Sequence, residues 1–140
     1  MQIKSRETSL SSLSQQNIAK KKFSFKYFER LHIQREFNKV FKSGLRLENR
    51  SIKVLVYKRD DGRITRRLGL ITPKKVGTVV VRNKTKRRLR EIFRTNKYLL
   101  EPGLDLIFIS KPETASLDYN SLKKVILSLL KNAKLYLNLE

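Results

Sequence analysis

The most constraining feature of this chain is a basic segment whose apolar residues recur with helical spacing. From Arg82 to Lys97 there are eight Lys or Arg residues and one acid, Glu91. At 100° per residue, one arc of a helix holds Thr85, Leu89, Ile92 and Phe93. An adjoining arc holds Asn83, Lys86, Arg87, Arg90 and Arg94. Lys84 and Arg88 point elsewhere. The segment therefore predicts a helix over residues 79–96 with one buried face and one basic face.

Like charges repel one another along this helix and across the whole chain. Pairs such as Lys86/Arg90, four residues apart, each destabilise a helix by roughly 0.2–0.5 kcal/mol. The 140 residues carry 33 Lys or Arg against 12 Asp or Glu, a formal charge of +21. Such a charge favours binding to nucleic acid or to an anionic membrane surface. Membrane-spanning proteins are excluded, because no apolar run approaches the ~20 residues that a spanning helix needs.

The pattern of the remaining segments predicts one α+β domain at residues 23–140, preceded by a disordered basic extension at residues 1–22. Helices are expected at 32–43 and 118–136, and strands at 51–58, 65–72 and 104–109. Gly62 supplies the turn of a hairpin between the first two strands. The order α-β-β-α-β-α predicts a single-domain α/β sandwich with one sheet. With no cysteine, disulfides and Cys-based metal sites are excluded.

Residues 67–94 read RLGLITPKKVGTVVVRNKTKRRLREIFR. This combination of strand, Lys-Lys-x-Gly loop and Arg-Asn helix resembles the signature of the bacterial ribonuclease P protein subunit. The pattern Phe37, Val40, Phe41 and Gly44 resembles the first helix of that family. The resemblance implies a mixed sheet with a left-handed βαβ crossover through the basic helix, whereas the general rule predicts a right-handed one. It also implies a role in removing the 5′ leader of precursor tRNA.

The resemblance implies two RNA-facing surfaces. One binds the catalytic RNA, and its residues are Arg82, Asn83, Lys84, Lys86, Arg87, Arg90 and Arg94. The other is a cleft for the single-stranded leader, and its residues are Phe37, Phe41, Tyr57, Lys74 and Lys75. Lys84 replaces the family's second Arg and loses its bidentate geometry. The family's strand aromatic corresponds to Leu55, and Tyr57 is assigned because it shares that face. Phe37 and Phe41 also lie on the core-facing stripe, so burial and base stacking are equally expected.

No catalytic residue and no metal site are expected on this chain. His32 is the only histidine, so neither a Ser–His–acid triad nor a His–His metal pair can form. The resemblance places cleavage, with its Mg²⁺ ions, on the RNA subunit, which makes the chain a cytoplasmic endoribonuclease subunit without its own cofactor. The alternative is a ribosomal or other structural RNA-binding protein. A DNA-binding regulator is less favoured, because residues 64–72 read as a strand rather than a helix. So is a membrane-surface helix, because the basic segment has little apolar face.

Overall fold

A four-stranded mixed sheet forms the centre of the protein. The computed structural model describes residues 25–135, so the predicted extension at 1–22 lies outside the described residues. The strands are β1 (Leu45–Glu48), β2 (Ile52–Lys58), β3 (Arg67–Ile71) and β4 (Leu104–Ser110), in the order β1-β2-β4-β3. β2 is antiparallel to β1 and β4, whereas β3 and β4 are parallel. The predicted α+β class with a mixed sheet is confirmed.

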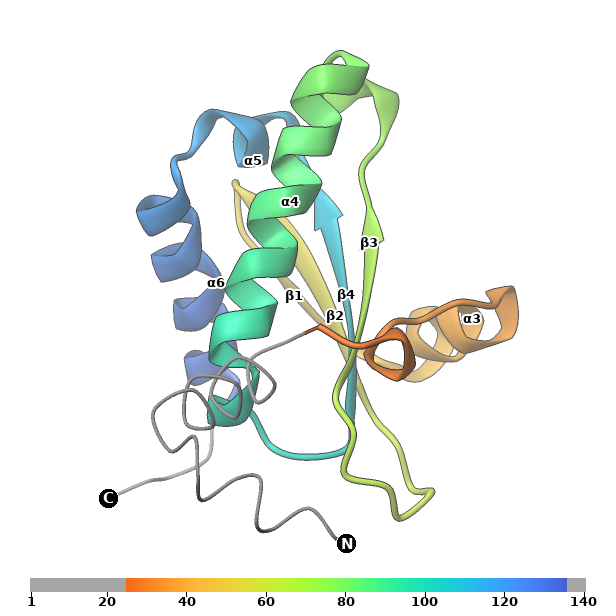
Figure 1. Cartoon of the computed structure of the whole chain (residues 1–140). Coiled ribbons are helices and arrows are strands. Elements are labelled where there is room, and N and C mark those ends of the chain that lie inside the picture. Colours follow the sequence, from red (N-terminus) through yellow and green to blue (C-terminus); the bar gives the residue numbers. More distant parts are fainter. Residues whose placement is uncertain (1–24, 136–140) are drawn as a thin grey trace, which may run out of the picture.

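Helices cover both faces of the sheet (Figure 1). The helices of the described residues are α3 (Gln34–Ser43), α4 (Val79–Asn96), α5 (Pro112–Ser116) and α6 (Tyr119–Asn132). Three 3₁₀ turns, η1 (Tyr27–Glu29), η2 (Lys74–Val76) and η3 (Lys97–Leu99), complete the elements. Figure 1 shows α4 in front of the sheet, with β4 to the left of the parallel strand β3. The crossover is therefore left-handed, as the resemblance implies and against the general rule.

Strand alternation sorts the core into two clusters, one on each face. The larger lies beneath α4 and α6 and includes Val54, Leu106 and Phe108 with Leu89 and Ile126. The smaller lies beneath α3 and is made of Leu31, Val40, Leu55 and Ile107. Because α3 is only ten residues long, it covers part of its face and leaves the rest of the sheet accessible on that side.

The sequence predicted a hairpin between the strands at 51–58 and 65–72, which correspond to β2 and β3. This prediction is wrong, because the two strands are not neighbours. The turn exists, with Gly62 at φ 77°, but β4 lies between β2 and β3 and pairs with both. The connecting loop reaches past β4: Arg59 N–H donates to the Gly103 carbonyl at 3.0 Å, and Gly103 N–H donates to the Ile64 carbonyl at 3.2 Å. β4 is the most deeply buried strand, and a strand apolar on both faces is stabilised most at the centre of a sheet.

Two additional elements and one helix boundary also differ from the sequence prediction. β1 is an additional strand of four residues that pairs with β2 immediately after Gly44. α5 is an additional short helix with Pro112 in its first turn. α6 ends at Asn132 rather than at 136, and Lys134, just beyond it, has a positive φ of 60°. The expected start of order at Phe23 lies outside the described residues, but Phe25 packs edge-on against Phe93 with ring centroids 5.5 Å apart.

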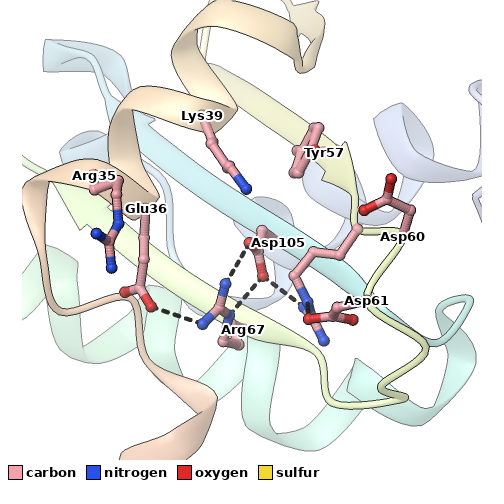
Figure 2. Close-up of a pocket in the computed structure, with 9 residues that line it drawn as sticks. Arg35, Glu36, Lys39, Tyr57, Asp60, Asp61, Arg67 and Asp105 are labelled. Atoms are coloured by element: carbon pink, nitrogen blue, oxygen red, sulfur yellow. Dashed lines mark hydrogen bonds and ion pairs between the residues drawn. The ribbon is translucent and has the colours of Figure 1, made fainter.

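A buried ion network joins α3 to the sheet (Figure 2). Asp105 of β4 has a side chain only 3% exposed. It accepts hydrogen bonds from Arg59 Nη1 at 2.6 Å and from Arg67 Nε and Nη2 at 2.8 Å. Arg67 Nη1 also donates to Glu36 of α3 at 2.8 Å. The hydrogen bonds that Arg67 donates to Asp105 raise the pKa of Arg67.

We expect Asp105→Asn to lower the free energy of unfolding by about 3 kcal/mol, because it removes the buried carboxylate that Arg59 and Arg67 share and leaves each guanidinium with only a more exposed acid, Asp61 or Glu36. Urea denaturation measures this change. The control is Glu101→Gln, which breaks the more exposed pair that Glu101 forms with Lys58 and is expected to change stability by less than about 1 kcal/mol. Equal losses in the two variants would show that the Asp105 network does not stabilise the domain.

Candidate nucleic-acid interface

Helix α4 is divided into a buried face and a basic face, as predicted. Thr85, Leu89, Ile92 and Phe93 are at most 2% exposed and pack against the sheet. Thr78 is the N-cap, and its Oγ1 accepts the Val81 N–H at 3.3 Å. Because the apolar arc is fixed against the core, the basic side chains point outward along the length of the helix.

The charge of this face is not balanced by nearby acids. Within residues 25–135, no carboxylate forms an ion pair with five cations of α4, which are Arg82, Lys84, Lys86, Arg87 and Arg90. The acids in these residues that form ion pairs do so with other cations, such as Arg59, Arg67 and Lys97. The face therefore has a positive potential suited to a polyanion.

Two arginines of α4, Arg88 and Arg94, bind partners that reduce their contribution to the basic face. Arg88 Nη1 donates to the Leu117 carbonyl at 3.0 Å, just beyond α5, so it points away from the basic face as predicted. Arg94 Nε donates to Glu91 Oε1 at 3.2 Å. This contact lowers the pKa of Glu91, so the acid is ionised and partly offsets the charge of Arg94. The unbalanced charge is therefore concentrated between Arg82 and Arg90.

Arg90 belongs to a cluster of arginines that the sequence did not reveal. Its pKa is lowered by partial burial first and then by the nearby charges of Arg30 and Arg87. Arg30 lies over the ring of Phe25, with its guanidinium carbon 4.4 Å from the centroid. Arg30 comes from the segment before α3, more than fifty residues from Arg90, so only the fold brings the two together. A phosphate group would relieve the mutual repulsion of these side chains.

The loop before α4 is held against the start of the helix. Lys74 and Lys75 are exposed in η2. Arg82 Nε donates to the Gly77 carbonyl at 3.2 Å, which joins the loop to the first turns of α4. The two lysines and Arg82 thus lie at the same end of the helix.

Phe37 and Phe41 lie on one side of α3 with ring centroids 6.5 Å apart. Phe37 is half-buried and packs over Gly69 of β3, where an added Cβ would lie 2.6 Å from Phe37 Cε1. Phe41 is 38% exposed. The two expected roles were burial in the core and stacking on a base. Phe37 packs in the core and stays partly exposed, and Phe41 is the more accessible ring.

An uncovered part of the sheet continues beyond these two rings. Lys53, Ile109 and Ile71 form one cross-strand row on the face that α3 packs against, and all three are half-buried. A groove of about 550 Å³ opens there, lined by Lys53, Lys75 and Ile109 among others. Lys53 was missed from the sequence, although a lysine within an otherwise apolar strand was a usable signal.

Tyr57 is separated from Phe37 and Phe41. It lies opposite Asp105, two residues along β2 from Leu55, and Leu55 is buried beneath α3. Figure 2 shows Tyr57 beside Lys39, above the ion network. At 100° per residue, Lys39 projects from α3 roughly 160° away from Phe37 and Phe41, so Tyr57 lies on the other side of the helix from the two phenylalanines. Shared parity places Tyr57 on the expected face, but two residues of strand span roughly 6.6 Å, and the helix crosses at this point.

Among residues 25–135 there is no cluster of three His, Cys, Asp or Glu side chains able to hold a metal ion. His32 stacks on Tyr27, and its Nε2 lies 2.7 Å from the Tyr27 carbonyl oxygen. None of the helices in this range has the length and apolarity to cross a bilayer.

Comparisons with known proteins agree with this geometry. The family model described as Ribonuclease P matches residues 25–134. The ribonuclease P protein component of Finegoldia magna is 38% identical over 104 residues, which cover 74% of this chain and 89% of the relative. That of Thermotoga maritima is 37% identical over 112 residues, covering 77% and 94%.

Solved structures give the same result. The ribonuclease P protein of Staphylococcus aureus superposes with a TM-score of 0.70 at 28% identity, covering 78% of this chain and 98% of that protein. That of Thermotoga maritima gives a TM-score of 0.66 at 36% identity, covering 74% and 96%. The chain therefore belongs to the ribonuclease P protein family, as the protein subunit of an RNA-containing endoribonuclease that acts in tRNA 5′ processing.

Proposed function

We propose that this chain binds the catalytic RNA through α4 and holds the unpaired 5′ leader of precursor tRNA in the groove beside α3. The observation that carries the proposal is the unbalanced charge between Arg82 and Arg90 on a helix whose opposite face is fixed in the core. A helix that accepts this repulsion is stabilised when phosphates lie along it.

The side chains of α4 suit a phosphate backbone. Arg82, Arg87 and Arg90 can each donate two parallel hydrogen bonds to a phosphate, and Lys84 and Lys86 add point charges. Asn83 is exposed and can hydrogen-bond a sugar or a base edge. Arg94 contributes less, because Glu91 is already bound to it.

The groove beside α3 suits an unpaired strand. Phe41 and the exposed part of Phe37 offer ring faces on α3, and the groove lies beyond them, where Ile109 lines it next to Ile71. Lys53 and Lys75 line the groove, and Lys74 is exposed in the same 3₁₀ turn as Lys75. Stacking of a base on an aromatic ring needs no particular sequence, which fits a leader that differs between tRNA precursors.

Chemistry belongs to the RNA subunit in this proposal. The protein raises the local concentration and fixes the register of the substrate, and Mg²⁺ ions held with the RNA would supply the activation of water. The cations of the protein offset phosphate repulsion between the two RNAs, so less Mg²⁺ is needed for the same affinity.

Replacing Arg82, Lys86, Arg87 and Arg90 together by glutamine is expected to weaken binding of a bacterial ribonuclease P RNA. Each lost phosphate contact lowers the slope of log affinity against log salt by about 0.7–0.9, so the slope falls by roughly 3 in total. Filter binding at several salt concentrations measures both quantities. The matched control replaces four lysines in and just after α6 by glutamine, at Lys123, Lys124, Lys131 and Lys134. The assigned surface is wrong if both quadruple variants change the slope equally.

Phe37→Ala is expected to weaken binding of precursor tRNA to the holoenzyme more than binding of mature tRNA, by the roughly 1–3 kcal/mol of one stacked base. Phe37→Leu is the companion variant, since it keeps most of the packing over Gly69 and lacks the ring. If both variants change the binding of precursor and mature tRNA equally while the melting temperature falls, Phe37 acts solely as a core residue.

A further inference from the structure

Two aromatic side chains project into solvent immediately before α3. Tyr27 is 75% exposed and Phe28 is 61% exposed, and both belong to the 3₁₀ turn η1. The groove of the proposed function does not include them. The turn itself is firmly held, because Glu29 forms a buried ion pair with Lys97 and Leu31 N–H donates to the Leu68 carbonyl at 3.0 Å. A rigid turn thus presents two exposed rings side by side in the chain.

The ring of Tyr27 is held in place on one side. His32 stacks on it with centroids 3.8 Å apart and an interplanar angle of 21°. The His32 backbone N–H donates to Glu36 Oε1 at 2.9 Å, which ties this ring pair to the first turn of α3. With His32 on one face and high exposure overall, Tyr27 has an open face on which another planar group can continue the stack.

Cations surround these rings. One hollow is lined by Tyr27, Phe28 and His32 together with Arg30 and Arg63. Its carboxylates are already bound: Glu36 pairs with Arg67, and Asp61 pairs with Arg59. Because Glu36 and Asp61 are paired with other arginines, the charges of Arg30 and Arg63 are not offset, and the hollow is positive.

A second hollow, shown in Figure 2, adjoins the first. Tyr57, Arg35 and Lys39 line it, and it shares Glu36, Arg59, Asp61 and Arg67 with the first hollow. Asp60 is its one acid without an ion pair among residues 25–135. The two hollows form a continuous path through these four shared residues, and at its Tyr27 end Arg30 and His32 also line a hollow with Phe37.

We propose that this path, which we call the aromatic platform (Tyr27, Phe28, His32, Tyr57, Arg35, Lys39 and Arg63), is a second binding site for unpaired RNA. Bases stack on Tyr27 and Phe28, and the arginines and Lys39 bind the flanking phosphates. Exposed rings next to unpaired cations favour single-stranded RNA over a duplex, whose bases are already stacked and whose grooves admit no ring face. The proposal rests on the proposed function. It assigns Tyr57 to RNA binding at the aromatic platform rather than in the groove beyond Phe37.

The test uses the double variant Tyr27→Ala/Phe28→Ala and a short single-stranded uridine oligonucleotide. We expect the variant to bind this oligonucleotide about tenfold more weakly than the unmodified protein, the effect of roughly 1.4 kcal/mol of lost stacking. Binding to a blunt RNA duplex, which depends on phosphate contacts, should change less than twofold. Tyr27→Phe/Phe28→Tyr, which keeps both rings, should restore oligonucleotide binding.

A matched control is Leu45→Ala, which removes an apolar side chain 50% exposed on the edge strand β1 and should leave oligonucleotide binding unchanged. Unchanged binding in the double variant, or an equal loss for duplex and single strand, overturns the platform. The platform is also overturned if the double variant loses binding to anionic vesicles while its binding to the oligonucleotide is unchanged.

The holoenzyme shows which RNA supplies the strand. A loss confined to precursor tRNA with a long leader identifies the leader, and a loss of affinity for the RNA subunit without any tRNA identifies that subunit. If the unmodified protein fails to support cleavage at all, the proposed function fails instead, and the oligonucleotide result stands by itself.

Discussion

Burial of one arc of α4 fixes the direction of every basic side chain on that helix. Leu89, Ile92 and Phe93 are held against β4 and its neighbours, so the helix cannot rotate to disperse its charges. The resulting repulsion is local, and the opposite face of the same helix helps to form the main core. RNA binding and folding stability are therefore linked: a polyanion bound along α4 stabilises the folded state by mass action.

The position of α3 decides how the other face of the sheet is divided. The helix crosses the row that contains Leu55 and Ile107 and buries it. On one side remain Phe37, Phe41 and the row of Lys53, and on the other remain Tyr57 and the Asp105 network. The network holds the first turn of α3 to β3 through Glu36. The contacts that stabilise the domain therefore also fix where α3 crosses the sheet, and so how much of the sheet is uncovered on each side of the helix.

Local patterns were sufficient to predict α4, its buried arc and the basic side chains between Arg82 and Arg90. They did not predict that β4 lies between β2 and β3, because a turn at Gly62 fits a hairpin and a wide loop equally well. They also grouped Tyr57 with Phe37, since parity gives the face of a strand but not where a helix crosses it. Arg30 and the platform around Tyr27 depend on contacts between distant segments, which no local pattern contains.

The central claim is that this chain supplies binding and the RNA supplies the chemistry. The most direct test is precursor tRNA cleavage at low magnesium concentration by a bacterial ribonuclease P RNA, with and without this protein. We expect the RNA alone to be nearly inactive and the added protein to restore cleavage at the correct 5′ position. Binding of the RNA without restored cleavage would contradict the account.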